Sequence, residues 1–102
     1  MIIIKSEIGE KLRELRKKKN ETLVNVSNCT SIDLALLSKI ERGERLPTSE
    51  QLKKLSGYYN FEESKLKILL VAEKIIKEYG ISEQTKDAIN MVEEQIEKYL
   101  KK

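Results

Sequence analysis

The chain has 102 residues, of which 39% are hydrophobic and 36% charged, enough for one domain with a modest core. It contains no histidine, and its four glycines form no phosphate-binding loop. We therefore expect no enzyme, no cofactor, no metal site and no small-molecule substrate. The single cysteine, Cys29, has no partner for an intramolecular disulfide, and we expect it to be a small buried hydrophobic residue.

The positive charge lies in the first part of the chain. Residues 1–60 carry 12 Lys and Arg against 8 Asp and Glu, whereas residues 61–102 carry 8 against 9. A basic first part is expected of a module that binds a polyanion such as nucleic acid. The apolar residues 2–4 are too few for a signal sequence or a membrane span, so we expect a cytoplasmic protein without a membrane partner.

The first predicted helix covers residues 7–19. Its apolar residues Ile8, Leu12 and Leu15 recur at helical spacing, which indicates an amphipathic helix. Asn20 can end the helix in the left-handed conformation. The last turn is basic, which suits both the helix dipole and contact with DNA phosphates, and the sequence leaves both interpretations open.

Two short helices joined by a tight turn are predicted next. Thr22 can cap the first, which extends to about residue 29, and Asp33 can cap the second. Gly43 can end the second helix because glycine tolerates a left-handed backbone. This arrangement is typical of a helix-turn-helix motif. The end of the second helix is basic, as suits an element that lies in a nucleic-acid groove, and its cations are Lys39, Arg42 and Arg45.

Three further helices are predicted toward the C-terminus. Thr48 and Gln51 can form a capping box that begins one helix, and a longer helix follows over residues 62–79. Ser82 can cap a sixth helix that extends to about residue 100. Its residues at heptad spacing are Thr85, Ile89, Val92, Ile96 and Tyr99. The predicted fold class is therefore all-α.

The run Leu-Ser-Lys-Ile-Glu-Arg-Gly-Glu-Arg at residues 37–45, followed by Pro47, resembles the end of the recognition helix in Cro/lambda-repressor-type (XRE family) helix-turn-helix transcriptional regulators. The resemblance extends over residues 8–66. It implies a lambda-repressor-like five-helix DNA-binding core with a C-terminal helical extension, and double-stranded DNA as the partner. The expected division is residues 1–66 for the DNA-binding domain and 67–102 for an extension that dimerises.

The resemblance also implies roles for individual residues. The positions that match the family's base contacts are Leu34, Ala35, Leu36, Ser38 and Lys39. Expected phosphate contacts are Lys17, Lys18, Lys19, Thr22, Arg42 and Arg45. In this family an arginine of the first helix pairs with a glutamate of the recognition helix, and the matching residues are Arg16 and Glu41.

Only one residue of the predicted base-reading set, Lys39, is a strong hydrogen-bond donor that could reach guanine. We therefore expect a binding site rich in T/A steps, recognised partly by its shape and flexibility. Leu23 departs from the family, which usually has a glutamine in contact with a phosphate at this position. Its presence weakens one expected contact.

Two structural alternatives stay open in the sequence. Leu34 and Leu36 could bind a protein instead of DNA, as in an adaptor such as an antitoxin or anti-regulator. The sixth helix could fold back on the fifth, or it could pair with its copy along a seam formed by Ile89, Val92, Ile96 and Tyr99. We favour a homodimeric repressor or autoregulator. The helical tail more loosely resembles that of regulators found beside restriction-modification genes, which would suggest a controller of such genes.

Overall fold

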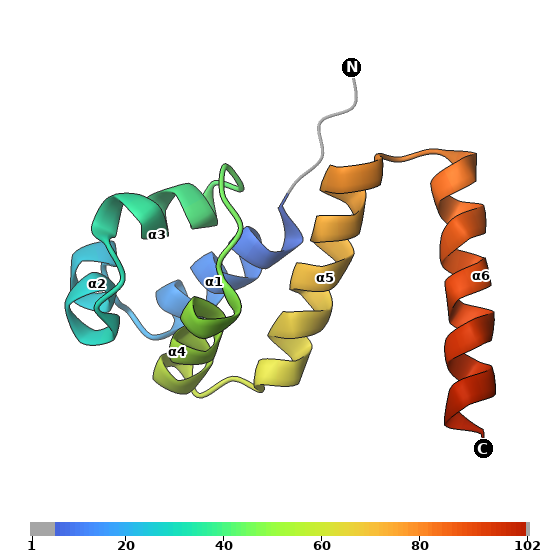
Figure 1. The fold of residues 1–102 in the computed structure, drawn as a ribbon. Helices are drawn as coiled ribbons and strands as arrows, with labels where there is room; N and C mark the ends of the chain where they lie inside the picture. The colour runs from blue at the N-terminus through green and yellow to red at the C-terminus, as the bar shows by residue number, and fades with distance from the viewer. Residues whose placement is uncertain (1–5, 102) are drawn as a thin grey trace.

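The computed structural model describes residues 6–101, and in this range the chain forms six α-helices and no strand (Figure 1). They are α1 (Glu7–Lys18), α2 (Leu23–Thr30), α3 (Leu34–Glu41), α4 (Ser49–Tyr59), α5 (Glu63–Tyr79) and α6 (Glu83–Leu100). The all-α prediction is confirmed. The segment of residues 2–4 discussed above lies outside the described residues. In the part that the structure describes, no helix combines the length and apolar character needed to cross a membrane.

The polar residues predicted as N-caps form capping hydrogen bonds at the starts of their helices. The side chains of Thr22, Asp33, Thr48 and Ser82 each accept a bond of 3.1 Å from the backbone N–H three residues further on. Gln51 completes the predicted capping box, because its side-chain oxygen accepts from the backbone N–H of Thr48 at 3.0 Å. Non-glycine residues with a positive φ follow three of the helices, namely Asn20, Ser31 and Asn60, and Gly43 with φ 78° follows α3 as predicted.

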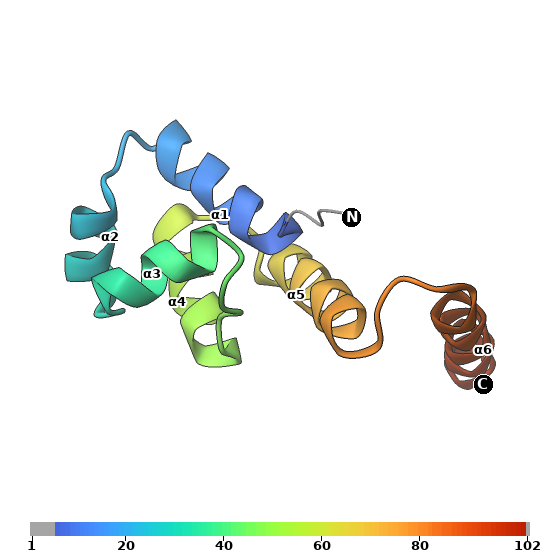
Figure 2. The ribbon, with the colours of Figure 1, turned by 90° about the horizontal axis from the view of Figure 1, so that it is seen from above.

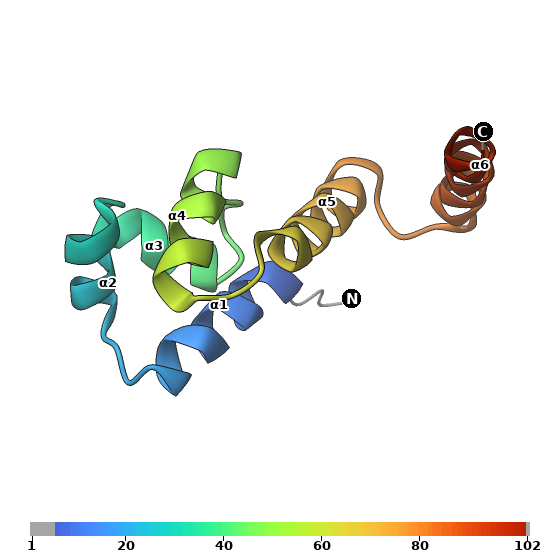
Figure 3. The same ribbon diagram turned by 90° about the horizontal axis from the view of Figure 1, so that it is seen from below.

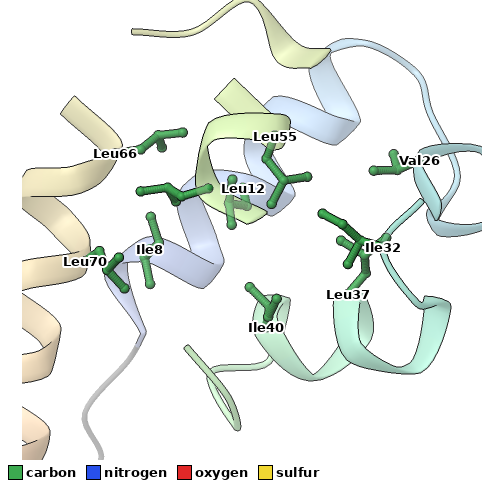
Figure 4. Close-up of a cluster of buried hydrophobic side chains, with 10 residues drawn as sticks. Ile8, Leu12, Val26, Ile32, Leu37, Ile40, Leu55, Leu66 and Leu70 are labelled. Carbon is green, nitrogen blue, oxygen red and sulfur yellow. The ribbon is translucent and has the colours of Figure 1, made fainter. Parts of the chain in front are cut away.

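Helices α1 to α5 pack around one apolar core, shown in Figure 4. Its side chains are at most 4% exposed and are Ile8, Leu12, Val26, Ile32, Leu37, Ile40, Leu52, Leu55, Leu66 and Leu70. Burial of each such side chain is favourable by about 1.5–3 kcal/mol relative to leaving it in water. The core includes Leu70, so the first half of α5 is an integral part of the five-helix unit.

The prediction that Cys29 is buried is wrong, because the structure leaves this residue exposed. The inward positions of α2 are instead Val26 and Thr30, which lie four residues apart. The hydroxyl of Thr30 donates to the Val26 carbonyl at 2.7 Å, so its polar atom is satisfied inside the core. Residues three and four positions apart both lie on the same face of a helix. The prediction placed Cys29, three residues after Val26, on the inward face, whereas the structure buries Thr30, four residues after Val26.

Helix α6 stands apart from the five-helix unit, as Figures 1, 2 and 3 show from three sides. None of its residues is buried. Of the proposed seam residues, Ile89 is 41% exposed, Val92 53% and Ile96 52%. In the single chain, α6 therefore does not fold back to bury its apolar face on α5.

A buried carboxylate joins α5 to the start of α1. Glu73 is only 8% exposed, and its two carboxylate oxygens lie 2.8 and 2.9 Å from the hydroxyl of Ser6, the N-cap of α1. One of these oxygens also accepts from the backbone N–H of Ile8 at 3.2 Å. A negative charge at a helix N-terminus is favoured by the helix dipole. Lys77, one turn further along α5, donates to the carbonyl of Gly43 at 2.8 Å. Helix α5 is thus tied both to α1 and to the loop after α3.

Glu73→Ala is expected to lower the free energy of unfolding by about 2–3 kcal/mol, because two donors at the start of α1 lose a charged acceptor. Urea unfolding followed by circular dichroism measures this change. Glu78→Ala is the matched control, since Glu78 is an exposed glutamate on the same helix and its loss should cost under about 0.5 kcal/mol. Equal effects of the two substitutions would contradict a structural role for Glu73.

Candidate nucleic-acid interface

The turn between α2 and α3 is held by its own side-chain and backbone bonds. Ser31 has a left-handed backbone with φ 61° and ψ 23°, and its N–H donates to the carbonyl of Ser27 at 2.9 Å. The hydroxyl of Ser27 donates to the Ile32 carbonyl at 2.6 Å. Ile32 itself is 4% exposed and anchors the turn in the core. Helices α2 and α3 are therefore held in a helix-turn-helix arrangement.

The other end of α3 is attached to α1 by an ion pair. Nε and Nη2 of Arg16 donate to the two carboxylate oxygens of Glu41, each at 2.9 Å. The third nitrogen of the guanidinium donates to the Glu21 carbonyl at 3.0 Å. The side chains are 15% and 8% exposed. The structure thus brings together the two residues that the family resemblance pairs.

The electrostatics of this junction follow from that pair. The hydrogen bond to Glu41 raises the pKa of Arg16, and burial of the guanidinium acts in the opposite direction. Burial also raises the pKa of the neighbouring Tyr59, and the Glu41 carboxylate adds to this effect. The guanidinium of Arg16 is therefore a stable cationic partner for the Glu41 carboxylate.

Gly9 allows a close approach of α1 to the end of α3, and the sequence analysis did not single it out. A Cβ at this position would lie 2.5 Å from the carbonyl oxygen of Ile40 and 2.8 Å from that of Glu41. Both obstacles are backbone atoms, which cannot move aside as a flexible side chain would. The only signal in the sequence is a small residue beside the apolar face of the first helix.

Most of the residues predicted to read bases lie on the accessible side of α3. Leu34 is 41% exposed, Ala35 and Lys39 are also exposed, and Ser38 is half-buried. Leu36 is half-buried as well, and it packs against the hydrophobic core. Only part of the Leu36 surface is therefore available to an external partner.

The predicted phosphate contacts are exposed, but three of the cations also interact within the protein. Lys18 Nζ lies 3.9 Å from a carboxylate oxygen of Glu14. Lys19 lies with its ammonium 3.8 Å from the ring centre of Tyr58 and donates to the Tyr58 carbonyl at 2.8 Å. The guanidinium of Arg42 bonds to the hydroxyl of Ser38 and the carboxylate of Glu44. The remaining predicted contacts are Lys17 at the end of α1, Thr22 at the start of α2 and Arg45 after α3.

Comparison with known protein families defines the class of this chain. Residues 9–69 match the family described as helix-turn-helix domain, so the chain belongs to this family. The match contains the whole of α2 and α3, the turn between them and most of the buried core. The prediction of a helix-turn-helix motif is thereby confirmed.

Individual relatives are similar over the same region. Two proteins named transcriptional regulator ClgR, from Mycobacterium tuberculosis strains CDC 1551 / Oshkosh and ATCC 25618 / H37Rv, are 38% identical over 50 residues. The aligned segment spans 49% of this chain and 45% of each relative. The crystal structure of the clp gene regulator ClgR from C. glutamicum superposes with a TM-score of 0.57 at 22% identity. It covers 72% of this chain and 95% of the solved chain, which shows a shared fold.

Arg16→Ala is expected to lower the free energy of unfolding by about 3–5 kcal/mol, because the carboxylate of Glu41 would be left largely buried without its partner. Thermal or urea unfolding of the purified variant measures the loss. Arg13→Ala serves as control, since Arg13 is an exposed arginine on the same helix. If Arg16→Ala is no more destabilising than Arg13→Ala, the junction does not hold α3 in place.

Proposed function

We propose that this protein is a sequence-specific DNA-binding transcriptional regulator of the Cro/lambda-repressor type that acts as a homodimer. The observation that carries the proposal is the exposed face of α3, a helix fixed to the core at both ends and followed by the cations Arg42 and Arg45. Membership of the helix-turn-helix family and the similarity to proteins named as transcriptional regulators support it. DNA as the partner also implies a cytoplasmic protein.

In the proposed complex α3 lies in the major groove. Leu34 and Ala35, which have no hydrogen-bonding side chain, meet thymine methyl groups, while Lys39 donates to N7 or O6 of a guanine. Ser38 can bond to several bases, and Leu36 contributes only its exposed edge. The operator is therefore rich in T/A steps. Phosphate contacts set the position of the protein without reading sequence, and they come from Lys17, Lys18, Lys19, Thr22, Arg42 and Arg45.

The two proposed roles, DNA binding and dimerisation, are assigned to consecutive parts of the chain. Residues 1–66 bind DNA, and residues 67–102 form the dimerising extension, which Leu70 and Glu73 attach to the core. Repression or autoregulation is the simplest mode of action, because a bound dimer blocks access to the DNA it covers. The looser resemblance of the tail to that of restriction-modification regulators extends the proposal to a controller of such genes.

Selection of binding sites from random duplex DNA at two salt concentrations tests the proposal. We expect an enriched two-fold symmetric site with half-sites about one helical turn apart, and an affinity that falls steeply with salt because phosphate contacts release counterions. Lys39→Ala should relax base preference at one position by about 1–3 kcal/mol. Lys18→Ala is the matched control and should weaken binding to all sequences alike.

Two outcomes of this experiment would contradict the proposal. If Lys39→Ala keeps the wild-type base preference, α3 is not docked as described. If no sequence is enriched and only weak salt-sensitive binding remains, the exposed surface around Leu34 and Leu36 is a protein interface, and the chain is an adaptor such as an antitoxin or anti-regulator.

Ile96→Glu is expected to convert the proposed dimer into a monomer, because it places a charge in the middle of the apolar seam of Ile89, Val92, Ile96 and Tyr99. Light scattering after size-exclusion chromatography measures the mass. Met91→Glu is the control: Met91 is a 62% exposed apolar residue of the same helix that lies outside the seam. A dimer that survives Ile96→Glu would rule out this seam.

A further inference from the structure

We propose that α6 pairs in an antiparallel orientation with α6 of a second copy, and that the second helix lies in the groove between α5 and α6. The inference rests on the proposed homodimer and specifies its orientation and register. Three observations on the described residues carry it: an open apolar groove, the position of the seam on its wall, and the charges that flank the seam.

The groove between the end of α5 and α6 has a volume of about 530 Å³. Ile75 and Tyr79 of α5 form one side, and Thr85, Ile89 and Val92 of α6 form the other. Two of the predicted seam residues, Ile89 and Val92, therefore face α5 across open space. Apolar surface of this kind is expected to be covered. A second α6, whose own seam includes Ile89, Val92 and Ile96, has the apolar face that this groove requires.

The charged residues beside the seam determine whether parallel or antiparallel pairing of two α6 helices is favoured. The residues that flank the seam lie inside its four-residue steps, Thr85 to Ile89 and Val92 to Ile96. Lys86 and Glu93 are the first residues inside these steps and follow the seam, whereas Ala88 and Gln95 are the last and precede it. In a parallel pair, a residue that follows the seam faces one that precedes it on the partner. The charged residues would then face uncharged ones. In an antiparallel pair, residues that follow the seam face each other, so that Lys86 can meet Glu93 of the second copy.

The same charges fix the register. Lys86 meets Glu93 when Val92 packs on Ile89 of the second copy and Ile96 packs on its Thr85. By symmetry, this ion pair forms twice. A shift by one heptad in either direction would instead bring Glu93 against Glu93 or Lys86 against Lys86, and like charges at such positions repel. In the favoured register the C-terminal end of the second α6 lies beside Ser82, which also lines the groove next to Tyr79.

Disulfide trapping of the full-length chain tests this orientation. Cys29 is exposed, so all variants first receive Cys29→Ser. Thr85→Cys and Ile96→Cys are then refolded separately and as a mixture, oxidised, and separated on a non-reducing gel. We expect crosslinked dimer in the mixture and little in either variant alone, because each residue would be about 16 Å from its own copy along the helix axis.

Charge exchange provides a second measurement that leaves the seam intact. Lys86→Glu should raise the dimer dissociation constant about tenfold at low salt, since two attractive pairs become repulsive. Adding Glu93→Lys should restore the wild-type constant. Glu94→Lys is the control, because Glu94 lies on the side of α6 opposite the seam, and it should change the constant little.

The outcomes separate this inference from the proposed homodimer. Crosslinking of each cysteine variant on its own, or no rescue by Glu93→Lys, would overturn the antiparallel orientation and leave the homodimer standing. A wild-type chain that is monomeric at all concentrations would overturn both. Crosslinking confined to the mixture, together with rescue by Glu93→Lys, is the expected result.

Discussion

The position of α3 depends on its contact with α1, and the rest of the proposed interface depends on that position. Gly9 lets the two backbones approach to a distance that no other residue would allow, and the Arg16–Glu41 pair then fixes the same end of α3. The opposite end is anchored by Ile32 and the left-handed turn at Ser31. A helix held at both ends and buried along one side presents its remaining face in a defined orientation. Recognition of base edges requires such a fixed orientation, since bidentate and van der Waals contacts tolerate little displacement.

Buried carboxylates join α1 to two of the helices that it packs against. Glu41 joins it to α3 and Glu73 joins it to α5. Burying a carboxylate is costly unless donors surround it, and each of these two has donors within 3.2 Å. Such groups favour one arrangement over similar ones, because any displacement would leave a charge unpaired. The aliphatic core supplies most of the stabilisation, and the carboxylates select how the helices are arranged around it.

Much of the helical framework could be predicted from the sequence, because it is set by local signals. Apolar periodicity and caps such as Thr48 with Gln51 act over a single turn of helix, so they can be read without knowing the fold. Glu73 and Gly9 could not be found in this way. Glu73 looks like an ordinary surface charge until Ser6, far away in the sequence, is placed beside it, and the need for Gly9 arises only when α3 crosses α1. The candidate site was predicted mainly through family resemblance, and its chemistry alone would not have shown that Leu36 packs inward.

Helix α5 connects the two parts of the proposed function. Its first half belongs to the core through Leu66 and Leu70, and Lys77 near its end bonds to the Gly43 carbonyl, directly after α3. The helix then leads to α6, which forms the proposed dimer seam. A helix held by contacts at both ends keeps α6 and α3 in a more constant relative position than a flexible linker would. The distance between the two recognition helices of a dimer would then be set by α5 and the pairing of α6. Because half-sites on DNA recur with the helical turn, this distance determines which operator spacing the dimer can occupy.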